Sequence, residues 1–333
     1  MRLKNKIKSL YAVLLLIAFA ILGNYLFNPQ LWLASQPETE LSVIEEAALI
    51  QQEKVEALKT FPKFQYSIRT ERSPQALAAA SGKLYVSYQR LNMVDVLDYQ
   101  GVRLKFFDPY PKGPINAVSL ATDRWNNLYL VDARNHSILV FDEELTFQSF
   151  FPPDRMNPAD VASVNVPSGI TINRSNVYVA DMGSSMAKSF MMDGNFVLAV
   201  PGTGKTEREP WHPIDIEITD DGRILVSDLK NRNISVFNCI GNFAHEFAIP
   251  EGRDRLQLPG GLAIDSEGRV HVLDRGSQKI FVYDNYGRFL FTYGLTGEGP
   301  LRLKSPMGIA IDKEKNLIFI ADSGNRKIDV WSL

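Results

Sequence analysis

Four histidines are the side chains of this chain best suited to metal binding or acid–base catalysis. A catalytic zinc site needs three convergent protein ligands and one open coordination position. The histidines instead fall in segments of different predicted structure: a turn, the residue before Pro213, an outer strand and a second strand, at His136, His212, His245 and His271. This spacing predicts no catalytic zinc, and we assign no catalytic residue.

The segment Gly202–Thr206, GTGKT, resembles a loop that holds nucleotide phosphates. The full motif G-x-x-x-x-G-K-T requires a glycine at position 199, where this chain has Ala199. No predicted helix follows to direct its N-terminus at a phosphate. We therefore interpret the segment as a surface loop.

Charge and cysteine content exclude further classes of function. The 333 residues carry a net charge of −2, whereas a nucleic-acid-binding protein is expected to be strongly basic. The single cysteine, Cys239, excludes an intramolecular disulfide and every multi-cysteine metal motif. We expect no nucleic-acid partner.

One unit of three short strands recurs six times from Pro74 to Leu333. In the last copy, Pro306–Leu333, two apolar runs flank a charged turn, and a second turn leads to a third strand. The residue that closes the second strand of each copy is found at Tyr88, Asp132, Asp181, Asp228, Asp274 and Asp322. Six copies at a step of roughly 45 residues predict an all-β, six-bladed β-propeller.

The segments VADMGSS, VLDRGSQKIFVYD and IADSGNRKIDVW, each preceded by P-x-G-[LI]-[AT]-I, resemble NHL repeats. The resemblance covers about Pro74 to Leu333 and is looser in the first copy, where Tyr88 replaces the aspartate. The last copy ends after its third strand. We expect the alternating segment Lys63–Thr70 to supply the fourth, which closes the ring and removes its open edges.

NHL-like propellers include enzymes, and the resemblance indicates where their metals would bind. Amidating lyases hold zinc through histidines at the starts of inner strands, but the matching positions here are Gln75, Ile115, Ser168, Ile214, Gly260 and Met307. Lactonase-like propellers hold calcium on the axis through oxygen ligands. Asn116, Ser168 and Asp215 are expected near the mouth of the axial channel. Three donors are few for calcium, so we expect no cofactor and keep a metal-dependent lactonase or lyase as the alternative function.

The N-terminal region predicts a membrane anchor. A basic tail, residues 1–9, precedes an uncharged apolar stretch, 10–33, that is long enough to span a bilayer. A signal anchor of this polarity keeps the N-terminus in the cytoplasm and places the propeller, residues 62–333, in the periplasm or outside the cell. A cleaved signal peptide is the alternative. Residues 38–61 predict an amphipathic helix that serves as a stalk or as a weak homodimer contact.

One face of the predicted disc carries the candidate binding residues. The turns between second and third strands share this face with the long crossings between blades, and binding residues concentrate on loops of a rigid scaffold. The candidates are Tyr88, Arg134, His136, Arg155, Trp211, His212, Lys230, Arg232, Arg275, Lys279, Arg326 and Lys327. We expect this face to hold an envelope or extracellular protein, or a glycan. The predicted function is therefore an extracytoplasmic binding or scaffold module.

Overall fold

The computed structural model describes residues 61–108, 114–153, 160–173, 175–202, 211–247, 255–297 and 301–333. The predicted membrane anchor, 10–33, and the predicted amphipathic helix, 38–61, lie outside these residues apart from Phe61. In these seven ranges, no helix is both long and apolar enough to cross a membrane. Residues Pro62–Leu333 form one compact unit.

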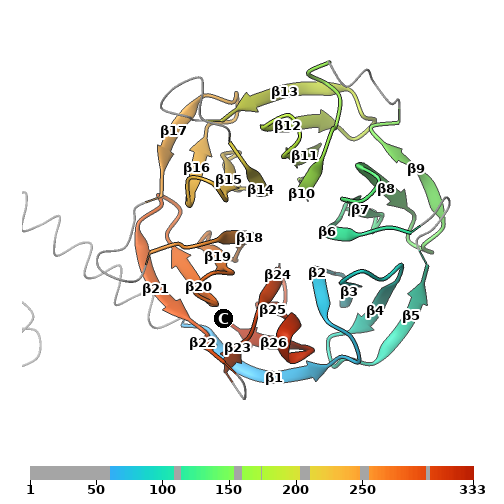
Figure 1. Ribbon diagram of the computed structural model, residues 1–333, viewed down its shortest axis with the longest axis vertical. Helices are drawn as coiled ribbons and strands as arrows, with labels where there is room; N and C mark the ends of the chain where they lie inside the picture. Colours follow the sequence, from blue (N-terminus) through green and yellow to red (C-terminus); the bar gives the residue numbers. More distant parts are fainter. Residues whose placement is uncertain are drawn as a thin grey trace, which may run out of the picture. The chain divides into compact units, whose positions relative to one another are not determined.

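Six four-stranded antiparallel sheets form a ring of blades, which confirms the all-β six-bladed propeller (Figure 1). The first blade contains β2 (Pro74–Ala80), β3 (Lys83–Tyr88), β4 (Val94–Asp98) and β5 (Arg103–Phe107). The second contains β6 (Ala117–Thr122), β7 (Leu128–Asp132), β8 (Ser137–Phe141) and β9 (Phe147–Phe151). The third contains β10 (Pro167–Ile172), β11 (Asn176–Asp181), β12 (Met186–Met191) and β13 (Phe196–Pro201).

The remaining blades repeat this order. The fourth contains β14 (Pro213–Ile218), β15 (Ile224–Asp228), β16 (Asn233–Phe237) and β17 (Phe243–Glu246). The fifth contains β18 (Pro259–Ile264), β19 (Val270–Asp274), β20 (Lys279–Tyr283) and β21 (Phe289–Tyr293). The sixth contains β24 (Pro306–Asp312), β25 (Leu317–Asp322), β26 (Lys327–Ser332) and the distant β1 (Lys63–Arg69). A short 3-10 helix, Ser323–Asn325, joins β25 to β26, and a small parallel pair, β22 (Leu295–Thr296) with β23 (Arg302–Leu303), lies in the last crossing.

The burial of each strand follows from its place in the blade. The second and third strands are almost continuously buried because both of their faces pack against neighbouring blades, as in β7 and β8. Such strands read as unbroken apolar runs. The outer strand lies at the edge of the sheet and has a neighbouring strand on one side only, and β5 is largely exposed. Each described core cluster therefore lies mainly between two adjacent blades.

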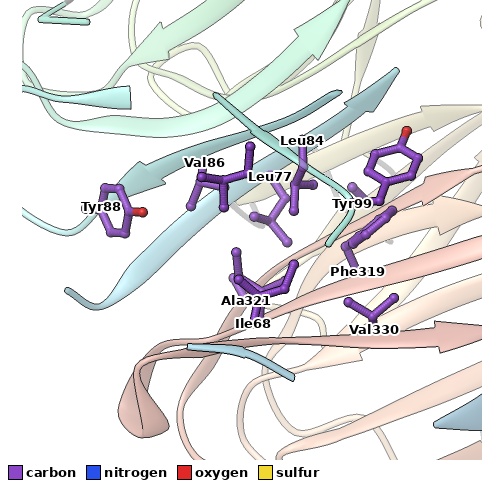
Figure 2. Close-up of a cluster of buried hydrophobic side chains, with 12 residues drawn as sticks. Ile68, Leu77, Leu84, Val86, Tyr88, Tyr99, Phe319, Ala321 and Val330 are labelled. Atoms are coloured by element: carbon purple, nitrogen blue, oxygen red, sulfur yellow. The ribbon is translucent and has the colours of Figure 1, made fainter. Parts of the chain in front are cut away.

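The sheet that closes the ring combines the two ends of the unit. Strand β1 pairs antiparallel with β26, and Ser67 Oγ donates a hydrogen bond to Asp329 Oδ1 at 2.6 Å. Ile68 lies in the apolar cluster shared by the first and sixth blades, with Phe319 and Val330 among its members (Figure 2). An early and a late segment of the chain thus share one sheet and one core.

Serine hydroxyls join neighbouring blades close to the axis. Ser87 Oγ donates to the carbonyl of Ala117 at 2.8 Å, and Ser227 Oγ donates to the carbonyl of Gly260 at 2.8 Å. Because each bond ends on a backbone atom of the next inner strand, it fixes the spacing between the two blades. The inner strands consequently form a rigid wall around the axis.

Candidate functional site

A cavity of about 290 Å³ lies on the propeller axis and is lined by all six inner strands. Figure 1 shows these strands, β2, β6, β10, β14, β18 and β24, facing the centre of the ring. Most of the wall is aliphatic or backbone, including Leu77, Val118, Leu120, Val166, Met182, Ile214, Met307 and Ile309. The polar side chains in the wall are Gln75, Ser119, Ser168, Asp215 and Arg275. This combination is typical of a small-molecule site.

Asp215 brings a carboxyl group into the cavity from strand β14. Its Oδ2 accepts a hydrogen bond of 2.8 Å from the backbone N–H of Leu262, in the next blade. Gly169 in the preceding blade leaves the space that this side chain needs, since a Cβ there would lie 2.5 Å from Asp215 Oδ1. Burial, with a smaller contribution from Glu217, raises the pKa of Asp215 to about 8. The group is therefore mostly protonated and neutral at pH 7.

Glu217 follows Asp215 on the same face of β14, because successive side chains of a strand alternate. Thr171 Oγ1 donates to Glu217 Oε2 at 3.1 Å. Burial raises the pKa of Glu217 to about 7, although the hydrogen bonds from Ile218 and Thr171 and the charge of Lys313 oppose this rise. The sequence analysis missed Glu217, and its spacing of two residues from Asp215 is the signal that could have found it.

Gln75 and Ser168 contribute polar groups from β2 and β10. Ser168 Oγ donates to the carbonyl of Pro213 at 2.7 Å and so joins the third and fourth blades. Gln75 is only 9% exposed, and its Oε1 has no hydrogen-bond partner in the described part of the chain. Asn116 was predicted beside them but is absent from the cavity wall. Its backbone N–H instead donates to Asp132 Oδ1 at 2.9 Å.

Arg275 stands at the end of the cavity formed by the turn after β19. Its aliphatic stem packs over Gly260, where an added Cβ would lie 2.8 Å from Arg275 Cδ. Burial lowers the pKa of Arg275, yet no ion pair or side-chain hydrogen bond holds its guanidinium within the described ranges. Arg275 therefore brings to the cavity wall a positive charge that has no ion-pair partner among the described residues.

The aspartate repeated in five blades orders the turns that follow it. Asp132 Oδ1 accepts bonds from the N–H groups of Asn116 and Arg134, at 2.9 and 3.0 Å. Asp228 Oδ1 accepts a bond from Lys230 N at 2.9 Å, and its Oδ2 accepts one from Asn231 Nδ2 at 2.5 Å. Each carboxylate thus satisfies turn amides and fixes the side chains that follow it. These aspartates are structural, as expected from their repetition.

Most of the basic candidates on the turns are exposed, and three other candidates are buried. Arg134, His136, Lys230, Arg232, Arg275 and Arg326 are exposed, whereas His212 and Lys279 are half-buried. Arg155 lies outside the described residues. Tyr88, Trp211 and Lys327, by contrast, have exposed fractions of 3%, 1% and 9%, which corrects their prediction as surface binding residues.

Each buried candidate has a partner inside the fold. The Tyr88 hydroxyl donates to Asp95 Oδ2 at 2.7 Å, and Lys327 Nζ donates to Asp329 Oδ2 at 2.7 Å. Trp211 packs edge-on against Phe237. These side chains consequently stabilise the blades and offer no surface to a partner.

Among the described residues, no three His, Cys, Asp or Glu side chains form a group that could hold a metal ion. His271 is completely buried, with Nε2 3.0 Å from Asp265 Oδ2 and Nδ1 3.0 Å from the hydroxyl of Tyr293. Since these partners occupy both ring nitrogens, His271 belongs to a structural network.

A family model described as a 6-bladed beta-propeller matches residues 261–333. NHL repeat-containing protein 3 of Homo sapiens is 28% identical over 211 residues, covering 54% of this chain and 56% of that protein. These findings, with the fold, support an NHL-repeat six-bladed propeller. Protein brain tumor of Drosophila melanogaster is 27% identical over 131 residues, which cover 38% of this chain and 12% of that protein. The matches therefore span less than two thirds of either relative.

Solved structures with low identity share the fold. A streptogramin B lyase superposes with a TM-score of 0.59 at 15% identity, covering 82% of this chain and 99% of the lyase. The structure of U3-55K gives a TM-score of 0.59 at 10% identity, covering 80% of this chain and 98% of that one. At these identities the similarity extends to the propeller architecture and no further.

Proposed function

We propose that this NHL-type propeller is a binding module that holds a protein partner on the face formed by its second-to-third turns. The observation that carries the proposal is a set of exposed cations on the second-to-third turns of three blades, Arg134, Lys230, Arg232 and Arg326. In the described ranges none of these four side chains has an ion pair. An acidic protein surface would complement this set of cations and be steered toward it.

The relatives support a protein partner. One is named as an E3 ubiquitin-protein ligase, of Homo sapiens, and is 27% identical over 115 residues. A ligase of this class acts on other proteins, so an NHL-like region can belong to a protein-recognising chain. A rigid ring with loop-borne charges suits the same use here, because a preformed surface loses little entropy on binding.

We also propose that residues 10–33 anchor the chain in a membrane and place the propeller outside the cytoplasm. This part of the proposal depends on the uncharged stretch and on the basic residues Arg2, Lys4, Lys6 and Lys8 before it. Protease added to intact cells or spheroplasts should digest the propeller domain. Protection of the propeller under these conditions, with digestion only after lysis, would overturn the proposed orientation.

The binding face is tested by charge reversal in the full-length chain. The variant Arg134→Glu, Arg232→Glu and Arg326→Glu should lose the dominant partner found by crosslinking in cells. The matched control Lys63→Glu, Arg124→Glu and Lys315→Glu reverses three exposed cations at strand ends or turns away from the proposed face and should keep that partner. Equal partner lists for the two variants would exclude this face as the docking surface.

A further inference from the structure

The axial cavity combines charged or polar side chains with a mostly aliphatic wall. Binding of a protein to the turns does not explain this combination. At one end stands the guanidinium of Arg275, which has no counter-ion within the described ranges. The wall beyond it is built largely from aliphatic side chains, among them Leu77, Met182, Ile214 and Met307. An arginine guanidinium favours a planar anion that it can bind through two parallel hydrogen bonds.

Polar groups with unused hydrogen-bonding capacity also face this cavity. The Asp215 carboxyl group accepts hydrogen bonds from the backbone N–H groups of Leu262 and Ile216, and as a protonated acid it could still donate one to a ligand. The enclosed Oε1 of Gln75 has no hydrogen-bond partner among the described residues. A buried polar group without a hydrogen-bond partner is destabilising, so a bound ligand that supplies the partner would explain it.

Two carboxyl groups lie on the same face of β14 at Asp215 and Glu217. Burial favours the protonated form of both. In the part of the chain that the structure describes, neither carboxyl group forms an ion pair with Arg275. The cavity wall therefore combines a cation, aliphatic side chains and a hydrogen-bonding acid.

We propose that the axial cavity binds a small organic carboxylate with an aliphatic body and a hydroxyl or carbonyl oxygen at its far end. The ligand carboxylate pairs with Arg275, the aliphatic body contacts Met182, Met307 and Ile214, and the far oxygen meets the Asp215 carboxyl group. A volume of about 290 Å³ is sufficient for a molecule of this kind. The ligand would use other side chains than the protein partner proposed above, because it needs none of Arg134, Arg232 or Arg326.

The test uses three molecules of equal length that differ in charge. The full-length chain is titrated with 6-hydroxyhexanoate, 1,6-hexanediol and 6-amino-1-hexanol, and binding is followed by ligand-detected NMR. We expect 6-hydroxyhexanoate to bind at least about tenfold more tightly than the other two, because only it can pair with Arg275. Equal binding of the three, or tighter binding of the amine, would overturn the proposal.

Variants separate the cavity from general surface charge. Arg275→Gln should weaken 6-hydroxyhexanoate binding by at least about tenfold, whereas Arg232→Gln, which removes an exposed arginine outside the cavity wall, should leave it unchanged. Met182→Trp offers a second route, because Met182 is 38% exposed and tolerates a larger side chain that fills the cavity. An equal effect of Arg275→Gln and Arg232→Gln, or unimpaired binding by Met182→Trp, would contradict an axial site. A chain that binds 6-hydroxyhexanoate but has no protein partner would contradict the proposed function and would leave the axial site supported.

Discussion

The carboxyl group of Asp215 accepts a hydrogen bond from the backbone N–H of Leu262, 2.8 Å away across the junction of two blades. It makes this bond from inside the axial cavity, where burial raises its pKa to about 8. The unfolded chain ionises this carboxyl near its ordinary value of 3.8. The folded protein therefore holds a proton that the unfolded chain has released across the intervening pH range.

This difference predicts that the contribution of Asp215 to the free energy of unfolding becomes less favourable as the pH rises. For an acid whose pKa is raised by folding, the stability present below pH 3.8 is lost progressively up to the folded pKa of about 8. Asp215→Asn is similar in shape to the protonated acid and cannot ionise. We expect it to raise the free energy of unfolding at pH 8 by about 1–3 kcal/mol, which is less than the full pKa difference implies because Asp215 is only half-buried.

Urea unfolding at pH 5 and pH 8 measures this effect. The gain from Asp215→Asn should be larger at pH 8 than at pH 5. Asp220→Asn is the control, because the Asp220 side chain is 87% exposed and should change stability little at either pH. A gain that is independent of pH would show that Asp215 is ionised in the folded state.

The fold was predictable because every blade repeats the same order of short strands and turns. An aspartate ends the second strand of five of the six blades at a step of roughly 45 residues, and its carboxylate accepts hydrogen bonds from the turn amides. Tyr88 replaces this aspartate in the first blade. The blade keeps its four strands, and the Tyr88 hydroxyl donates a hydrogen bond to Asp95. A single unmatched position therefore did not obscure the period.

The binding-face residues were harder to predict, because the packing of loop side chains does not repeat from blade to blade. Trp211 looks exposed in a long crossing, but Gly202 provides the space that lets it pack inward, as a Cβ there would lie 2.3 Å from Trp211 Cβ. Lys327 follows a turn and was expected on the surface, but its Nζ donates a hydrogen bond to the buried Asp329. Asp215 was found because strand register determines which side chains face the axis.

Closure of the ring by β1 predicts a large effect of Ile68→Ala. Ile68 is 6% exposed and contacts the cluster between the first and sixth blades (Figure 2). Its truncation leaves a cavity there and should lower the free energy of unfolding by about 2–4 kcal/mol. Ile240→Ala, at a position that is 70% exposed, should cost less than about 0.5 kcal/mol. Similar unfolding midpoints in urea for the two variants would mean that β1 contributes little to the closed ring.

The third blade contains a completely buried ion pair, with Lys188 Nζ 2.7 Å from Asp181 Oδ2. Burial alone would raise the pKa of Asp181, but Lys188 and the N–H groups of Val166 and Asn165 together hold it below its ordinary value. Lys188→Met leaves this carboxylate buried without a counter-ion and should lower stability by about 3–5 kcal/mol.

Neutralising both partners separates the charge effect from the loss of packing around Lys188. In Lys188→Met/Asp181→Asn the asparagine oxygen can still accept the 2.7 Å bond from Val166 N–H, and no charge is left buried. Urea unfolding of the single and double variants should therefore show that the double variant recovers at least about 1 kcal/mol relative to Lys188→Met. If the double variant is instead the less stable of the two, the ionic interaction is not what Lys188 contributes, and its hydrogen bond to the carbonyl of Ser163 becomes the main stabilising contact.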